Sequence, residues 1–174
     1  MEQIVQLNSQ ANLSEHLASP SEATLGHSNK LDGSHLSPHF VLGEFTRSNS
    51  HSNIYNVPTH EAIYNMKNLC KWLEVLRERS GGPIRINSGY RSPQLNKKVG
   101  GAPTSNHLTG CAADIRVTGM EQLIRYAAIL LDYVDETGEE FDELLLEKNR
   151  FGAFWLHFAV KPKGNRHKVL FLSV

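Results

Sequence analysis

Two histidines and one aspartate in the second half of the chain have the side-chain types of a zinc site. His107 and Asp114 lie in the stretch from Ser88 to Ile115, which is rich in Gly, Pro, Ser and Asn, and His157 follows within Trp155-Leu156-His157. Two neutral imidazoles and one carboxylate suit Zn²⁺ and leave a fourth position open, as in catalytic zinc sites. A Zn²⁺ ion with these ligands keeps a net positive charge, which preserves the Lewis acidity of the metal and lowers the pKa of a bound water to about 7.

Spacing alone does not select these three residues. The chain has nine histidines, and the step from His107 to Asp114 crosses Gly110. This arrangement differs from the compact helical His-Glu-x-x-His pattern, in which both histidines lie on one helix face. The residues around the three candidates therefore decide the interpretation.

Those surrounding residues resemble a known family. The segments are Ser88-Gly-Tyr-Arg-Ser92, Val99-Gly-Gly-Ala102, Ser105-x-His107-x-x-Gly110-x-Ala112-x-Asp114 and Trp155-x-His157. In this order they are similar to the zinc D-alanyl-D-alanine carboxypeptidases, a family that includes phage endolysins and peptidoglycan L,D-endopeptidases. The resemblance covers roughly residues 38 to 160. It implies a compact α+β fold shared with the signalling domain of hedgehog proteins.

The resemblance also implies a role for each matching residue. His107, Asp114 and His157 would be the ligands of a Zn²⁺ cofactor. Arg91 would bind and polarise the substrate near the scissile carbonyl, and Ser105 would be a supporting, substrate-binding group beside the first ligand. The implied activity is hydrolysis of amide bonds in the stem peptides of bacterial peptidoglycan, by a carboxypeptidase or an endopeptidase, including a phage or prophage lysin.

Three neighbouring residues have competing interpretations. A fixed guanidinium at Arg91 can stabilise an oxyanion or bind a terminal carboxylate through paired hydrogen bonds. Its alternative role is a loop arginine tied to a carbonyl or a carboxylate. Tyr90 is a candidate for substrate binding, although aromatic residues in such positions more often belong to the core. Cys111 is expected to pack inward as a small apolar group and is rejected as a ligand.

Peptide hydrolysis by a zinc enzyme needs a carboxylate that takes a proton from water and passes it to the leaving amine. Some members of the family carry an acid three residues before the last histidine ligand, where this chain has Phe154. In the more similar branch an acid ends the preceding strand, so we predict Glu147 as the base. Strand alternation places Glu143 on the same face, as the reserve candidate. The alternative is that Glu147 is a solvated charge at a strand end.

A different class of function also stays open. A zinc-stabilised binding module of the same fold, without turnover, would explain why Phe154 stands where relatives have an acid. The zinc peptidase is the preferred hypothesis, and the inactive module is its alternative.

The elements that must position these residues predict an α+β domain over residues 37–174. Residues 43–58 are expected to be irregular. A helix then begins at Thr59 or His60 with one apolar face and ends at Gly81-Gly82. A short helix begins at Ser92-Pro93. Thr118 with Glu121 predicts a capping box for a third helix, whose apolar side includes Ile124 and which ends before Gly138. Strands are predicted over 83–88, 112–115, 141–147, 154–161 and 168–174. With the last two joined as an antiparallel hairpin, the helices pack on a small, mainly antiparallel sheet.

The first part of the chain is unlike the rest. Residues 1–36 are dominated by Ser, Asn, His, Glu and Gln without sustained apolar periodicity, so we predict a disordered or linker segment. His16, His27 and His35 are expected to be solvated there. The N-terminus lacks the basic and apolar regions of a signal peptide, which predicts a product that is cytoplasmic as synthesised and acts on the cell wall if released.

Composition excludes several classes of partner. The formal net charge is zero and no basic stripe is present, so nucleic-acid binding is not expected. No apolar stretch approaches the roughly 20 residues that span a bilayer. The two cysteines, Cys70 and Cys111, are expected to be unlinked buried thiols. We expect a monomer that acts on a peptidoglycan peptide.

Overall fold

The computed structural model describes residues 33–48 and 50–174. The prediction for residues 1–36 therefore falls mostly outside the described residues, as do His16 and His27. Within 33–36, His35 forms a β-bridge with Val41 and Leu36 is 8% exposed in the core. The chain thus already contacts the domain at these residues.

The longest helix forms where the apolar periodicity predicts it. Helix α2 spans His60–Ser80, and the Thr59 side chain accepts a hydrogen bond from the Ala62 amide at its start. Gly81 ends it with a φ of 75°, a left-handed conformation that glycine adopts without steric cost. Most of its apolar side chains lie in the core, so α2 is a packing helix.

The sheet has five strands in the order β1-β2-β4-β3-β5. They span Ile86–Ser88 (β1), Ala112–Arg116 (β2), Glu143–Lys148 (β3), Phe154–Ala159 (β4) and Lys168–Ser173 (β5). Three neighbouring pairs are antiparallel, and β3 with β5 is parallel. The predicted class, helices on a small and mainly antiparallel sheet, is confirmed.

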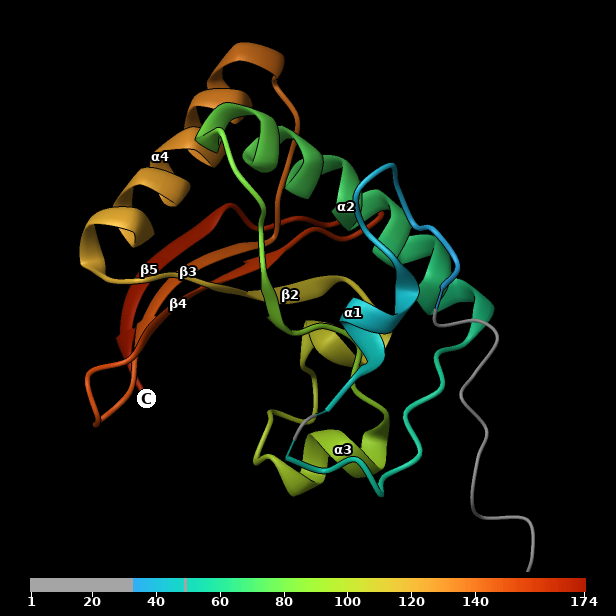
Figure 1. The fold of residues 1–174 in the computed structure, drawn as a ribbon. Coiled ribbons are helices and arrows are strands. Elements are labelled where there is room, and N and C mark those ends of the chain that lie inside the picture. Colours follow the sequence, from blue (N-terminus) through green and yellow to red (C-terminus); the bar gives the residue numbers. More distant parts are fainter. Residues whose placement is uncertain (1–32, 49) are drawn as a thin grey trace, which may run out of the picture.

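Helices α2 and α4 (Met120–Thr137) cover one face of this sheet (Figure 1). Trp72 of α2 contacts Phe158 of β4 with ring centroids 5.3 Å apart, and Leu144 and Leu156 are fully buried on the same face. Because side chains alternate along a strand, the residues between them point to the other face. That second face is free to carry polar chemistry.

The predicted hairpin between the last two strands is wrong. β5 pairs with β3 in parallel rather than with β4. The physical reason is that β4 already pairs on one edge with β2 and on the other with β3. The backbone groups of β5 therefore find unpaired partners at the outer edge of β3.

Three local predictions also need correction. Residues Leu42–Thr46 form a short helix, α1, where irregular structure was expected. Helix α4 begins after Gly119 without a side-chain cap, and Thr118 instead contacts the Gln122 side chain. Ile124, expected on the buried side of α4, is 54% exposed. Helix propensity and burial at these points are decided by neighbours that periodicity does not reveal.

Two short elements complete the frame of the site. Helix α3 spans Pro93–Lys98, and the 3₁₀ helix η1 spans Asn106–Thr109. Gly110 ends η1 with a φ of 72°, and a Cβ there would lie 2.4 Å from the Ala62 carbonyl oxygen of α2. Only glycine allows this close approach, which packs η1 against α2.

Candidate metal centre

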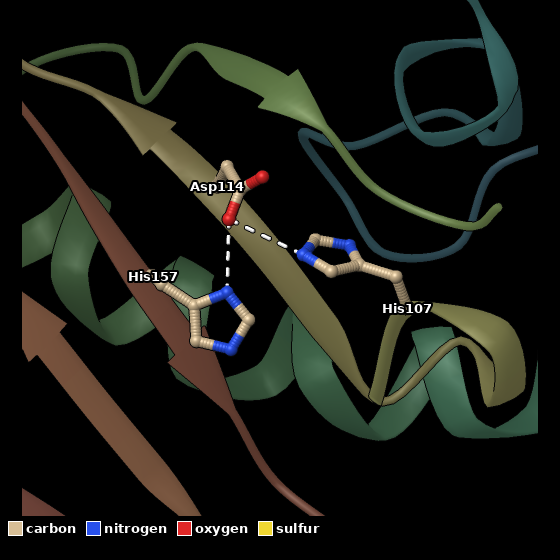
Figure 2. A group of neighbouring side chains, drawn as sticks. All are labelled: His107, Asp114 and His157. Carbon is tan, nitrogen blue, oxygen red and sulfur yellow. Dashed lines mark hydrogen bonds and ion pairs between the residues drawn. The ribbon is translucent and has the colours of Figure 1, made fainter. Parts of the chain in front are cut away.

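Three elements bring His107, Asp114 and His157 together on the face of the sheet that the helices leave uncovered. His107 comes from η1, Asp114 from β2 and His157 from β4. The sheet register places Asp114 directly opposite His157. All three are buried, and each offers a ligand atom within 4.8 Å of the others. Figure 2 shows the two rings converging on one carboxylate oxygen.

The distances fit a shared ion. Asp114 Oδ1 lies 3.2 Å from His107 Nε2 and 2.9 Å from His157 Nδ1. A tetrahedral zinc with bonds of about 2.1 Å separates its ligand atoms by about 3.4 Å. Two imidazoles and one carboxylate are also the donor set that zinc prefers for a site with an open position.

The ring of His107 is held in one orientation. Its Nδ1 lies 2.6 Å from the Gly89 carbonyl oxygen, which accepts a hydrogen bond only if Nδ1 carries the proton. Nε2 is then unprotonated and directed at Asp114, the state that a metal ligand requires. Burial also lowers the pKa of His107, and this outweighs the opposing effect of Asp114. His107 is therefore a neutral ligand ready for a metal.

The carboxylate and the second histidine are charged in the protein without metal. Burial disfavours ionised Asp114, but the two histidines hold its pKa far below its usual range. Burial also disfavours protonated His157, yet the hydrogen bond with Asp114 and the nearby Glu143 carboxylate raise its pKa above the ordinary value. Metal binding at His157 Nδ1 must therefore displace a proton.

Arg91 lies beside this cluster, on the loop before α3. Its Nη2 donates to Asp114 Oδ2 over 2.6 Å and its Nε donates to Ser88 Oγ over 2.9 Å. Neither bond uses Nη1, and Arg91 lines the cavity above the cluster. Part of the guanidinium thus orients Asp114. The alternative interpretation, a loop arginine tied to a carboxylate, accounts for this contact but not for Nη1.

The two predicted substrate-binding residues differ in position. Ser105 lines the cavity, and its Oγ accepts from the His107 amide over 3.4 Å as the cap of η1. Tyr90 is 6% exposed and belongs to the hydrophobic core. Its burial argues against direct contact with a substrate, and the preceding Gly89 packs closely against Phe45 of α1.

The predicted base and its reserve both line the cavity, which has a volume of about 610 Å³. Glu147 and Glu143 lie on the same face of β3, on either side of Leu145, which is opposite His157. Trp155 is opposite Glu147. Both carboxylates are thus placed near the metal ligands by register alone.

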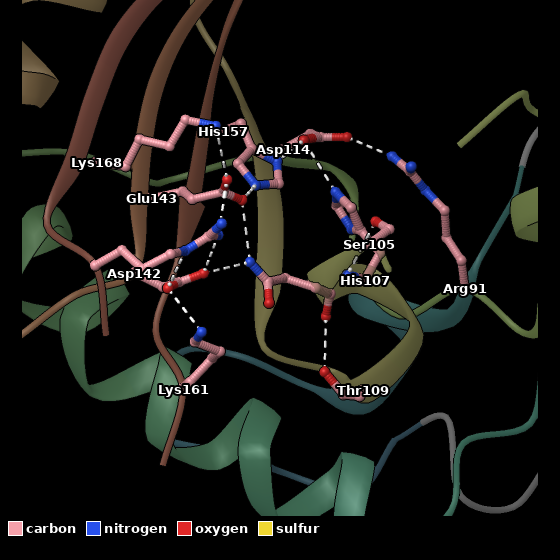
Figure 3. Close-up of polar contacts among 12 residues, drawn as sticks. Arg91, Ser105, His107, Thr109, Asp114, Asp142, Glu143, His157, Lys161 and Lys168 are labelled. Carbon is pink, nitrogen blue, oxygen red and sulfur yellow. Dashed lines mark hydrogen bonds and ion pairs between the residues drawn. The ribbon is translucent and has the colours of Figure 1, made fainter. Parts of the chain in front are cut away.

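A network of polar residues around Glu143 was missed in the sequence (Figure 3). Arg166 forms two hydrogen bonds with the buried Asp142, over 2.8 and 2.6 Å. Asn106 donates to both Asp142 and Glu143, and Lys168 contacts Glu143. The available signal in the sequence was the adjacent pair of acids Asp142-Glu143, together with the basic residues Arg166 and Lys168 just before and at the start of β5.

The cysteines agree with the sequence prediction. Cys70 and Cys111 are both buried and unlinked. Cys111 Sγ faces the Thr109 carbonyl oxygen at 3.9 Å, and Cys111 is not part of the His-Asp-His group. No helix among the described residues has the length and apolar character needed to cross a membrane.

Comparison with known proteins identifies the family of this chain. The family model described as peptidase M15 matches residues 38–138, which is more than half of the chain. The chain belongs to the peptidase M15 family. It is therefore related to zinc metallopeptidases, and Zn²⁺ is the cofactor that its three-residue donor set accommodates.

A curated relative is the zinc D-Ala-D-Ala carboxypeptidase of Streptomyces albus G, 36% identical over 77 residues. The alignment covers 44% of this chain and 30% of that protein, so the match spans less than a third of the relative's length. The family match covers Arg91, His107 and Asp114 but ends before Glu147 and His157. The structure joins the matched and unmatched parts into one site.

Proposed function

We propose that this protein is a zinc peptidase that hydrolyses amide bonds in the stem peptides of bacterial peptidoglycan. The observation that carries the proposal is the buried His107–Asp114–His157 group, which opens onto a cavity that also contains Glu147 and Arg91. A binding site for a structural ion needs neither a cavity nor a neighbouring base. The site around His107, Asp114 and His157 has both.

In the proposed mechanism, His107, Asp114 and His157 hold the cofactor. When bound, zinc supplies Lewis acidity to a carbonyl and lowers the pKa of a coordinated water. Glu147 takes a proton from the attacking water and delivers it to the amine that leaves. Burial raises the pKa of Glu147 above its ordinary value, which makes this carboxylate a stronger base than a solvated one.

Arg91 has two tasks in this mechanism. Its Nη2 orients Asp114 through the 2.6 Å bond. Its Nη1 is used in neither side-chain bond and Arg91 lines the cavity, so Nη1 can donate to the oxygen on which negative charge develops as the carbonyl is attacked. Ser105 supports the site by capping the helix that carries His107.

The substrate class is proposed from the family and the relative. A relative named zinc D-Ala-D-Ala carboxypeptidase points to peptides that contain D-alanine. The cavity of about 610 Å³ has room for several residues of an extended peptide. We further propose that the peptidase serves as a phage or prophage lysin, which acts on the cell wall after its release from the cytoplasm.

The test is digestion of purified peptidoglycan by the zinc-loaded protein, with mass spectrometry of the products and metal analysis of the same sample. One zinc per chain with new amino termini is expected. Release of free D-alanine would identify a carboxypeptidase, and conversion of cross-linked fragments into separate stem peptides would identify an endopeptidase. Intact wall with one zinc bound would contradict the proposal.

A zinc-stabilised binding module without turnover is the second candidate. It is favoured by Phe154, which occupies the position where some family members have an acid and lies at the start of β4. Glu147→Gln separates the two functions because a binding module does not need a base. In a peptidase this variant retains zinc and loses hydrolysis, whereas the exposed Glu140→Gln control retains both.

A further inference from the structure

We propose that Glu143 is a positioning residue that fixes the ring of His157 so that Nδ1, and not Nε2, binds the metal. The inference rests on the zinc ligands of the proposed function but does not depend on hydrolysis. It assigns the reserve candidate for the base to a different task.

The two nitrogens of His157 have different surroundings. Nδ1 lies 2.9 Å from Asp114 Oδ1, on the side of the metal ligands. Nε2 is buried and forms no hydrogen bond with the described residues. The carboxylate oxygen Oε2 of Glu143 lies 3.6 Å from it. This distance is slightly longer than a hydrogen bond, so a small rotation of either side chain brings them within range.

Glu143 is itself held from both oxygens. Oε1 contacts Arg166 Nη2 at 2.9 Å and Lys168 Nζ at 3.4 Å, and Oε2 accepts from Asn106 Nδ2 over 3.0 Å. Arg166 is anchored in turn by its two hydrogen bonds with Asp142. These contacts fix the carboxylate beside His157 and occupy it, which disfavours a role as a mobile proton carrier.

The consequence for His157 follows from the chemistry of imidazole. A carboxylate beside Nε2 favours the tautomer in which Nε2 carries the proton, because only that tautomer donates to it. Nδ1 then has a free lone pair directed at the ion. Carboxylate–histidine–metal arrangements of this kind orient the ring and raise the basicity of the ligand.

The same network connects the two histidine ligands. Asn106, which binds Glu143, directly precedes His107 on η1. Glu143 therefore ties the strand β3 both to the ring of His157 and to the helix of His107. Loosening Glu143 is expected to misplace the ligands without removing one.

The first test measures zinc affinity by competition with a chelator for Glu143→Ala, Glu143→Gln and the exposed control Glu140→Ala. We expect Glu143→Ala to bind zinc about 10–100-fold more weakly than the control. Glu143→Gln is expected to recover part of the affinity because its amide oxygen still accepts from Nε2. Affinities within about twofold of the control would overturn the inference.

The second test uses the wild-type protein and does not depend on the folding of a variant. Long-range ¹H–¹⁵N spectra of the zinc-loaded protein should show His157 with a protonated Nε2 and a metal-bound Nδ1. A metal-bound Nε2 would overturn the inference. Failure to bind zinc at all would overturn both this inference and the proposed function, whereas bound zinc with absent hydrolysis would count against the proposed function alone.

Discussion

The two ends of β3 carry the same side chain in opposite environments. Glu143 and Glu147 lie on one face of the strand, and both line the same cavity. Around Glu143 stand Arg166, Lys168 and Asn106. The main influence on the pKa of Glu147 is burial, and Trp155 lies opposite it on β4.

This difference separates their acid–base behaviour. Contact with His157, together with the cations Arg166 and Lys168, lowers the pKa of Glu143 to about 2 although burial opposes it. Burial raises the pKa of Glu147, and the opposing effect of His157 is smaller. A carboxylate of low pKa is a stable anchor, while one of raised pKa exchanges protons more readily near neutral pH.

The comparison shows that position in a motif does not assign a role to an acid. Two carboxylates in one site take different tasks when their surroundings push their pKa values apart. Here Glu147 suits the base and Glu143 suits the support of His157.

The largest effect is expected in turnover. Glu147→Gln should lower kcat by about 10²–10⁴-fold, the usual contribution of a general base, with zinc content unchanged. At saturating zinc, Glu143→Gln should retain most of kcat. Steady-state kinetics on a peptidoglycan peptide with metal analysis checks both, and an equal loss of kcat in the two variants would erase the distinction.

The cationic surroundings of Glu143 should matter for stability. Arg166→Ala removes two charge-assisted hydrogen bonds from the buried Asp142, so the free energy of unfolding should fall by about 2 kcal/mol. Urea unfolding of this variant and of Lys163→Ala, which removes an exposed charge from the same loop, provides the measurement. Equal stability of the two variants would show that the network does not stabilise the fold.

The two acids should have opposite effects on the stability of the metal-free protein. The lowered pKa of Glu143 stabilises the fold above its unfolded value near 4.5, and this contribution is lost as the pH falls through about 2. The raised pKa of Glu147 costs stability at neutral pH, and the cost disappears as the pH falls below that unfolded value.

Thermal unfolding at pH 7 should therefore show a lower Tm for Glu143→Gln and a higher Tm for Glu147→Gln. The gain from Glu147→Gln should vanish near pH 4. Glu140→Gln is the control for removal of a charge. Shifts of the same sign for both variants at pH 7 would count against the difference between the two ends of β3.

The smallest effect concerns Trp155. A side-chain interaction with Trp155 favours the charged form of Glu147, so Trp155→Phe should move the pKa of Glu147 further upward. Titration of the metal-free protein followed through the carboxyl ¹³C resonances measures this shift. An unchanged pKa would show that Trp155 does not influence Glu147 and would contradict this prediction.

Much of the first half of the site could be predicted from the sequence because it is local. Turn residues and caps near Ser92 and Gly110 shape the loop that carries Arg91 and His107, and their signals lie within a few residues. The second half depends on strand register. His157 faces Asp114, and Glu143 faces the ring, only because β4 lies between β2 and β3.

Helix α2, the fold class, the resemblance to zinc carboxypeptidases and the residue types of the metal group could all be predicted from the sequence. Each depends on side-chain periodicity, on capping or on the order of short motifs, and all of these are patterns within short segments of the chain. The tertiary structure alone decided that β5 joins β3, that Arg166 and Lys168 reach Glu143, and that the two glutamates differ. These outcomes depend on which strand edges remain unpaired and on charges distant in sequence, and local patterns do not encode either.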